Sequence, residues 1–176
     1  MKVAQFHEML VQRHSIRKYT DQPISAEAVK TIIEAALMAP SSKRCTPWEF
    51  LLVDNKEILE KLSHCREFGA GPIAKCSLAV FVMADPQKSS AWIEDCAIAA
   101  TYIQLQAEAL GIGSCWVQIR DRFDKDGDSA QDYISQFVNI PGEQQILCAI
   151  TLGHPDEQRK PFDLEKLQWE KVHIAQ

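Results

Sequence analysis

Apolar residues recur at helical spacing through residues 90–110, SAWIEDCAIAATYIQLQAEAL. On one face an apolar residue recurs every three or four positions. The opposite face carries Ile98 and Tyr102, so it is mostly apolar as well. A helix that is apolar nearly all round is buried rather than laid on a surface. The pattern therefore predicts a buried central helix, capped by Ser90 and ended by Gly111.

The rest of the chain alternates between helical and strand patterns. Helices are expected at 2–12, after a Ser25 cap, after an Asp54 cap and around 133–138, and strands at 48–53, 77–84, 114–119 and 145–152. The strand LAVFVMA is continuously apolar, as is typical of a strand buried on both faces. Strands separated by helices, with long helices dominating, indicate one domain over residues 1–176, an α+β or α/β sandwich with the sheet in the middle.

Length and charge narrow the class of protein. At 176 residues the chain is one domain, or one subunit of a dimer, with enough apolar content for a core. A net charge of −5 and a pI near 5.5 argue against a general nucleic-acid or anionic-membrane binder. The N-terminus is not a signal peptide, and no apolar run reaches the length of a membrane span. We therefore expect a soluble, cytoplasmic protein.

The patterns of metal and hydrolytic sites are absent from the sequence. The six cysteines have no metal-ligand spacing, so we expect reduced, buried thiols, except for Cys45 in a polar loop. The DKDGDS stretch from Asp124 lacks the Glu that an EF-hand needs at loop position twelve. No hydrolase triad, P-loop or G-x-G-x-x-G motif is present either. Because neither the cysteines nor the DKDGDS stretch forms a metal-ligand pattern, we expect no bound metal.

Two cationic stretches could bind an anion. In RHSIRKY, Arg13, Ser15 and Arg17 are spaced to point two guanidinium groups and a hydroxyl at one phosphate. The alternative is a helix end whose cations offset the helix dipole. Arg159 and Lys160 matter only if the fold brings them to this cluster. Two tryptophans, Trp48 and Trp116, are core residues or walls of a pocket for a flat ligand.

Taken in order, these pieces resemble the nitroreductase family of FMN-dependent oxidoreductases along nearly the whole chain. RHSIRKY is similar to the family's N-terminal phosphate-binding motif, and APSSKRCTPWEF to its Ala-Pro-Ser-x-x-x-x-x-Pro-Trp loop. EDCAIAATYIQLQAEALGIGSCW resembles its long dimer-forming helix and the following strand, and NIPGEQQILCAITLGHPDEQRKP its last strand and tail. The resemblance implies a homodimeric α-β-α sandwich with a central mixed sheet.

The resemblance also implies a site residue by residue, with FMN at the subunit interface. Arg13, His14, Ser15 and Arg17 would bind FMN, the last reaching towards the pyrimidine edge of the flavin. Pro40, Ser41 and Ser42 would come from the other subunit. Cys115, Trp116, Val117 and Gln118 would pass close to the isoalloxazine ring, and Arg159 and Lys160 would complete the phosphate site.

The function implied is ping-pong hydride transfer from NADH or NADPH, through flavin N5, to an electron-poor acceptor such as a nitroaromatic, quinone or enone. The flavin would carry the chemistry, so no catalytic side chain is expected. Where many members have Asn and Gln, this chain has Arg44 and Thr46. Two alternatives are therefore a flavin-binding or sensing protein without turnover, and a reductase or dehalogenase with one narrow substrate.

Overall fold

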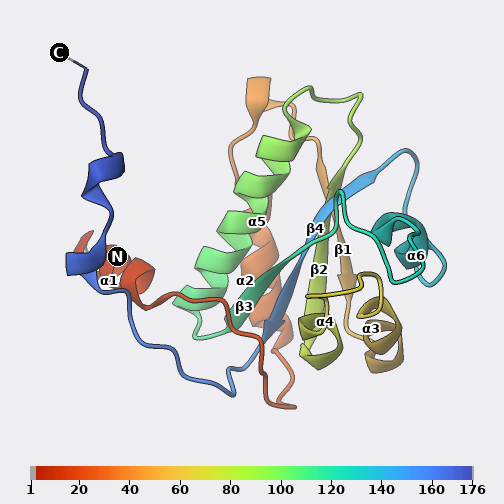
Figure 1. The fold of residues 1–176 in the computed structure, drawn as a ribbon, viewed down its shortest axis with the longest axis horizontal. Helices are drawn as coiled ribbons and strands as arrows, with labels where there is room; N and C mark the ends of the chain where they lie inside the picture. The colour runs from red at the N-terminus through yellow and green to blue at the C-terminus, as the bar shows by residue number, and fades with distance from the viewer. Residues whose placement is uncertain (1–2, 176) are drawn as a thin grey trace.

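A four-stranded sheet forms the centre of the molecule in a computed structural model that describes residues 3–175 (Figure 1). The strands are β1 Trp48–Val53, β2 Leu78–Ala84, β3 Gly113–Gln118 and β4 Gln145–Gly153, in the order β1-β2-β4-β3. All three strand pairings are antiparallel, so the expectation of a mixed sheet was wrong for these strands. β4 lies between β2 and β3 and is antiparallel to both, so no two neighbouring strands among these four are parallel.

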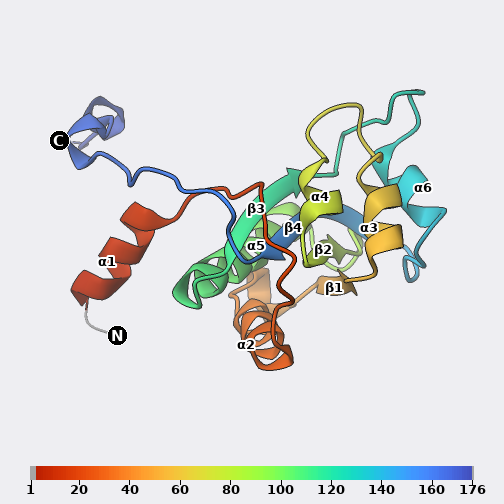
Figure 2. The ribbon, with the colours of Figure 1, turned by 90° about the horizontal axis from the view of Figure 1, so that it is seen from below.

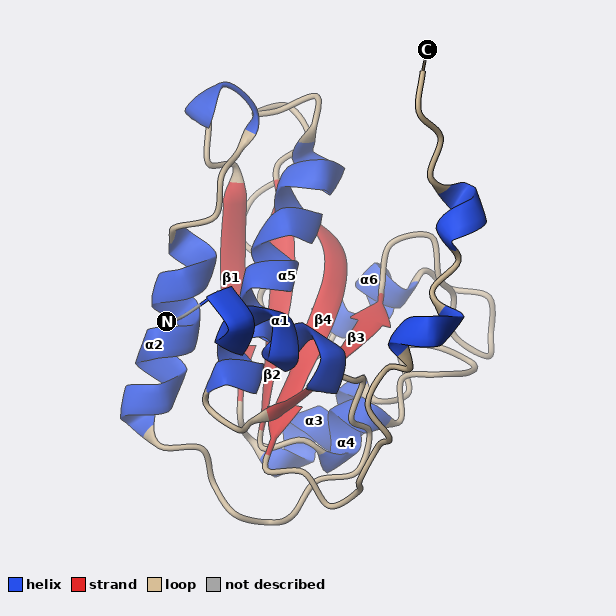
Figure 3. Ribbon diagram, turned by 90° about the vertical axis from the view of Figure 1, so that its left-hand side faces the viewer, coloured by secondary structure: helices blue, strands red, loops and turns tan. Residues whose placement is uncertain are grey.

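Helices cover both faces of the sheet (Figure 3). On one face α2 Ala26–Leu37 and α5 Trp92–Ala109 pack against Val80 and Val82. On the other, α3 Lys56–Leu62, α4 Pro72–Lys75 and α6 Ala130–Ser135 pack near Ala79 and Phe81. Successive β2 side chains point to opposite faces, and all seven are buried. The expected α-β-α sandwich and the buried 77–84 strand are therefore confirmed.

The long central helix is present, but its cap and its surroundings differ from the expectation. α5 begins after Ala91, whose side chain makes no capping hydrogen bond. Ser89, not the predicted Ser90, provides the hydroxyl that accepts a hydrogen bond from the Ala91 amide. One face of α5 is buried, whereas Ile98 and Tyr102 remain more than a third exposed. The rest of the chain therefore covers only one side of α5, although the helix is apolar on nearly all sides.

The other caps follow the sequence in part. Ser25 caps α2 as expected and accepts from the Ala28 amide at 3.2 Å. Asn55, not Asp54, caps α3, accepting from the Ile58 amide at 3.1 Å. α6 starts earlier than expected because Ser129 caps it.

Both ends of the chain project from this body. Figure 2 shows α1, Val3–Gln12, and the C-terminal tail extending together to one side of the sheet. The tail carries two short 3-10 turns, Leu164–Lys166 and Trp169–Lys171. Its larger apolar side chains are exposed: Phe162, Leu164, Leu167, Trp169, Val172 and Ile174.

Candidate functional site

The segment after α1 and the beginning of the tail run side by side across the ends of β3 and β4. The Ile16 amide donates to the Ser114 carbonyl at 2.9 Å, an isolated parallel bridge between residues 15 and 114. The Thr20 amide donates to the His154 carbonyl, also at 2.9 Å. These bonds place the RHSIRKY motif, the start of β3 and the tail in one location.

Two glycines allow this close approach. A Cβ on Gly113 would lie 2.9 Å from Ile16, and a Cβ on Gly153 would lie 2.7 Å from the ring of Tyr19. The Tyr19 hydroxyl is fixed in turn, 2.8 Å from the Thr151 hydroxyl and 2.6 Å from the Ile16 carbonyl. The cationic RHSIRKY motif is therefore held against the sheet by a close backbone contact that larger residues at positions 113 and 153 would prevent.

Donors from both segments converge on the carboxylate of Glu157. It accepts from the backbone amides of Arg17 and Lys18 and from Arg159 Nη2, the last at 2.6 Å. The hydrogen bond from the Arg17 backbone N–H is the main reason that the pKa of Glu157 lies below its ordinary value. A carboxylate of the chain itself thus sits among the groups that would receive an anion.

A pocket of about 260 Å³ lies beside this cluster, lined by His14, Arg159, Gly113 and Glu108 among others. His14 stacks on Phe162, with ring centroids 4.6 Å apart, and its buried Nε2 has no hydrogen-bond partner. Burial raises the pKa of Glu108, although the charges of Arg13 and His14 oppose this. His14 and Arg159 therefore line the same hollow, and Arg13 lies close enough for its charge to act on Glu108.

The predicted β3 stretch continues from this pocket. Burial raises the pKa of the Cys115 thiol, and the nearby Arg17 charge and Ser15 hydroxyl offset part of the rise. Trp116 packs against the core and donates from Nε1 to Gln118 Oε1 at 3.0 Å. Val117 is buried in the core below. Trp48, the other candidate, is a buried core residue.

Sequence reasoning missed two side chains that hold the predicted site residues. Arg66, in the loop after α3, donates from Nη1 to the Gln118 carbonyl at 3.0 Å. Asp95, in the first turn of α5, accepts from the Ser42 amide at 2.7 Å. Each contact joins positions more than fifty residues apart in the sequence, and no local spacing signals it.

Loop 40–47 is strained and tied to α5. Lys43, Arg44 and Thr46 all have positive φ, at 51°, 58° and 41°. Such backbone is uncommon outside glycine and costs about 1–3 kcal/mol per residue, so it persists only where the surroundings impose it. Cys45 is exposed as expected, and its thiol lies 3.8 Å from Asp95 Oδ2.

Within one chain this loop is far from the cluster of Arg13, His14, Arg17 and Arg159, here called the Arg13 cluster. Ser42 is held by Asp95 near the beginning of α5, whereas Arg13 and His14 act on Glu108 near its end. At about 1.5 Å per residue, Asp95 and Glu108 are about 20 Å apart along α5. The structure thus brings together the predicted residues of the N-terminal motif, β3 and Arg159, but not Pro40, Ser41 and Ser42.

Lys160 follows Arg159 and is exposed. Over residues 3–175, no three or more histidine, cysteine or acidic side chains are grouped to hold a metal ion. Nor is any described helix both long and apolar enough to cross a bilayer. Cysteines 65, 76, 96, 115 and 148 are buried and unpaired, as expected, and burial raises the pKa of Cys65 and of Cys76 to about 12.

Comparison with known proteins settles the family. The model of the nitroreductase family matches residues 10–68 and 67–154. The chain belongs to the nitroreductase family. A solved structure named as an FMN-dependent nitroreductase from Clostridium difficile R20291 superposes with a TM-score of 0.92 at 43% identity, covering 96% of this chain and 98% of that one.

Two relatives of similar length extend the comparison to archaea. A protein of Archaeoglobus fulgidus, named as a candidate NADH dehydrogenase/NAD(P)H nitroreductase, is 31% identical over 171 residues, with 94% of this chain and 95% of that one covered. A Methanothermobacter thermautotrophicus protein with the same name is 32% identical over 170 residues, with 93% and 86% covered. The family likeness therefore spans nearly the whole chain.

Proposed function

We propose that the protein is an FMN-dependent oxidoreductase that passes reducing equivalents from NADH or NADPH to an electron-poor acceptor. The observation that carries the proposal is the convergence of Arg13, Ser15, Arg17 and Arg159 at the start of β3. The FMN dependence printed in the name of the Clostridium difficile structure supports it.

The donor set fits a flavin mononucleotide. Guanidinium groups and backbone amides suit a phosphate, and the Arg17 and Lys18 amides are already arranged around an anion, the Glu157 carboxylate. The unpartnered Nε2 of His14 offers a further polar contact in the adjoining pocket. From Ser114 to Gln118, β3 extends about 13 Å, enough to run beside the ring once the phosphate end is held.

The cofactor, when bound, supplies the hydride chemistry that no side chain here provides. The chain's own residues would bind and orient it. Arg13, Ser15, Arg159 and Lys160 would hold the phosphate end, and the Arg17 charge would favour negative charge at the pyrimidine edge. The backbone of residues 115–118 would face N5. Donor and acceptor would use one open face in turn, which predicts ping-pong kinetics.

A homodimer is part of the proposal. Loop 40–47 lies about 20 Å along α5 from the Arg13 cluster of its own chain, so both could touch one flavin only if they came from different subunits. The half-exposed face of α5 and the projecting α1 and tail support this arrangement, because they offer apolar surface that the chain itself leaves uncovered.

The first test is the visible spectrum of the purified protein, with chromatography of what it releases on denaturation. The proposal expects about one FMN per subunit and NAD(P)H oxidation with nitroaromatic or quinone acceptors. FMN binding without turnover of any acceptor would favour a sensing protein. Turnover confined to one acceptor, with nitroaromatics inert, would favour a specialised reductase. A protein that neither contains nor binds FMN would overturn the assignment.

Arg13→Ala tests the residue set directly. Loss of one charge-assisted contact should weaken FMN binding by roughly 1–3 kcal/mol, measured by flavin fluorescence titration of the apoprotein. Lys30→Ala is the control, because Lys30 is exposed on α2 and pairs with Glu34 on the same helix. Equal FMN affinity in the Arg13 variant and the wild type would exclude Arg13 from the phosphate site.

A further inference from the structure

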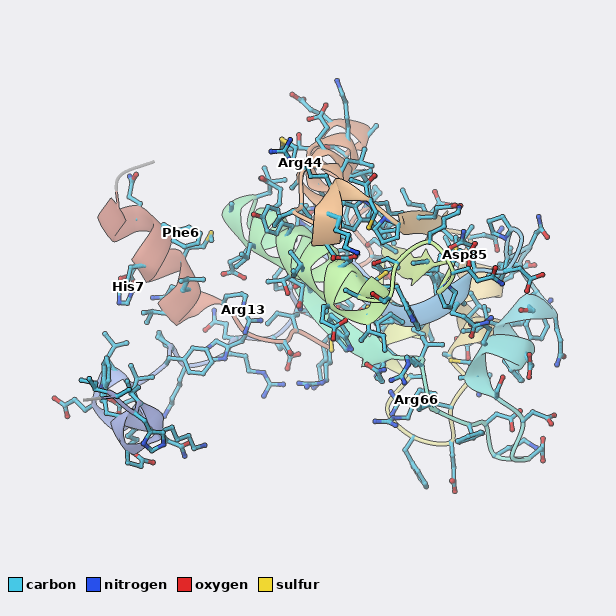
Figure 4. The ribbon with its side chains drawn as sticks, turned by 90° about the horizontal axis from the view of Figure 1, so that it is seen from above. Phe6, His7, Arg13, Arg44, Arg66 and Asp85 are labelled. Atoms are coloured by element: carbon cyan, nitrogen blue, oxygen red, sulfur yellow. The ribbon has the colours of Figure 1, made fainter. Side chains whose placement is uncertain are left out.

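A second pocket, of about 340 Å³, opens beyond the end of β3, away from the Arg13 cluster. Its lining comes from the loop after α3 and the loop after β3, and includes Arg66, Phe68, Arg122 and Phe123. Figure 4 shows Arg66 on the main body, well apart from α1 and from Arg13. None of these residues belongs to the predicted flavin-binding set.

The pocket is continuous with that set through Arg66. The Arg66 guanidinium donates to the carbonyl of Gln118, the last residue of β3. It also packs against Gly69, where a Cβ would lie 3.4 Å from Nη2. The Glu67 amide donates to the Phe123 carbonyl at 3.1 Å, and the Ala130 amide to the Arg122 carbonyl at 2.8 Å. The two loops are thus joined, and the pocket is formed in advance.

Two arginines and three acidic residues line the pocket, and the arginines are not paired with those acids. Among residues 3–175, neither Arg66 nor Arg122 forms an ion pair. Burial and the neighbouring Arg122 charge lower the pKa of Arg66. Two nearby guanidinium groups without a carboxylate partner repel each other, and an added anion would relieve that repulsion.

The acidic residues of the pocket are engaged elsewhere or point to water. Asp124 is buried, and its Oδ1 accepts from the amides of Asp126 and Asp128 in its own loop. The Asp121 carboxylate pairs with Arg120 at 2.8 Å. Glu67 is exposed. Arg66 and Arg122 each donate from Nη1 to a backbone carbonyl, of Gln118 and of Asp121, so among the described residues no carboxylate neutralises either charge.

The walls of the pocket are aromatic. Phe68 is 75% exposed and Phe123 is 58% exposed, although both belong to ordered loops. Exposed phenylalanines beside unpaired arginines suit a ligand with a flat apolar body and an anionic group. A volume of about 340 Å³ admits one ring with its substituents and is at the small end of ligand sites.

We propose that this pocket selects electron acceptors that carry a carboxylate on an aromatic ring, with the carboxylate received by Arg66 and Arg122. This inference rests on the proposed function, because it makes the pocket the acceptor end of the flavin site. The ring would lie between the phenylalanines, beside the end of the strand that faces the flavin. Bidentate pairing with a guanidinium would fix the acceptor's orientation.

Binding of redox-inert analogues tests the proposal without turnover. Calorimetry on the FMN-loaded protein should show benzoate binding at least about tenfold tighter than benzyl alcohol, as one charge-assisted contact provides. Arg122→Gln should reduce this ratio to within about twofold of unity. Lys125→Gln is the matched control, because Lys125 lies in the same loop, pairs with Asp126 and does not line the pocket.

Kinetics provide the second readout. The ratio of kcat/KM for para-nitrobenzoate over para-nitrobenzyl alcohol should fall about tenfold in Arg122→Gln and remain unchanged in Lys125→Gln. Arg66→Gln should lower the same ratio. A protein that binds benzoate selectively but oxidises no NAD(P)H would contradict the proposed function and support the pocket.

Two results would overturn the inference while leaving the proposed function intact. The first is turnover with no preference for the carboxylate in either readout. The second is an unchanged carboxylate ratio in Arg122→Gln with a lowered preference for NADPH over NADH. The anion recognised would then be the additional ribose phosphate of the donor.

Discussion

Asp95 shows how one buried charge organises a loop. It is 2% exposed, and its two oxygens receive the Ser42 amide, the Ser89 hydroxyl and the Cys45 thiol. Its position in the first turn of α5 places the negative charge where the helix dipole favours it. The strained backbone from Lys43 to Thr46 needs such an anchor.

Asp95→Ala should therefore destabilise the protein and loosen loop 40–47. We expect a loss of about 2–3 kcal/mol in the free energy of unfolding, because hydrogen bonds to a charged group are lost and the Ser42 amide keeps no partner. FMN affinity should fall as well, since Ser41 and Ser42 are proposed to contact the flavin. Urea unfolding and flavin titration measure the two effects.

Glu94→Ala is the control for Asp95, as Glu94 lies in the same helical turn but is exposed. Equal stability of the two variants would show that Asp95 does not anchor the loop. Asp95→Asn should recover part of the stability, because an amide oxygen can still accept from Ser42.

For individual residues, the sequence identified those candidate site residues that stand in short motifs. Arg13, Arg17 and Arg159 stand in cationic stretches, and the fold gathers them at the start of β3. Arg66 and Asp95 could not be found in this way. Their roles depend on partners across the fold, and an isolated arginine or aspartate has no local pattern that distinguishes it from a surface charge.

Between elements, the docking of residues 13–20 on β3 and β4 positions the proposed phosphate site. The contact is made by backbone, and it is possible because Gly113 and Gly153 present no side chain to Ile16 and Tyr19. Gly113 has no positive φ, so its role is space alone. The helical and strand patterns say nothing about this contact.

Gly113→Ala should push the N-terminal segment away from β3. A Cβ 2.9 Å from the Ile16 side chain forces a shift that we expect to cost about 1–3 kcal/mol of stability. FMN affinity should fall with it, because Ser15 and Arg17 move too. Gly71→Ala is the matched control, since a Cβ there meets nothing within 4 Å. Thermal unfolding and flavin titration of both variants decide the point, and identical behaviour would contradict it.

The strands were the most predictable elements and the helix boundaries the least. Strand 48–53 was predicted to the residue, and β2, β3 and β4 within one residue at each end, because unbroken apolar runs between turn residues leave little choice. The predictions of Ser90 and Asp54 as caps were wrong. The neighbouring residues Ser89 and Asn55 have side-chain oxygens that can accept the same kind of hydrogen bond, and these oxygens accept it in the structure. Sequence alone does not rank such neighbours.

The whole molecule leaves a large apolar surface on one side. A groove of about 310 Å³ runs between α1, α2 and α5, lined by Phe6, Met9, Tyr102 and Leu105 among others. Tyr102, on the central helix, is 38% exposed. Sequence patterning foresaw this helix as buried all round, and the structure shows that burial of its outer face requires a second body. An apolar face of this kind is typical of an interface between subunits.

Leu105→Glu places a charge in the middle of this groove and should separate the proposed dimer. Burying an unpaired carboxylate costs several kcal/mol, whereas the free monomer solvates it, so light scattering should report one subunit instead of two. FMN affinity should fall in parallel, because loop 40–47 of the second subunit would be lost from the site. Gln136→Glu, just after α6 on the opposite face of the sheet, is the control and should remain dimeric. A monomeric variant that retains full FMN affinity would show that one chain builds the site alone. A wild-type monomer that binds FMN would exclude the shared site altogether.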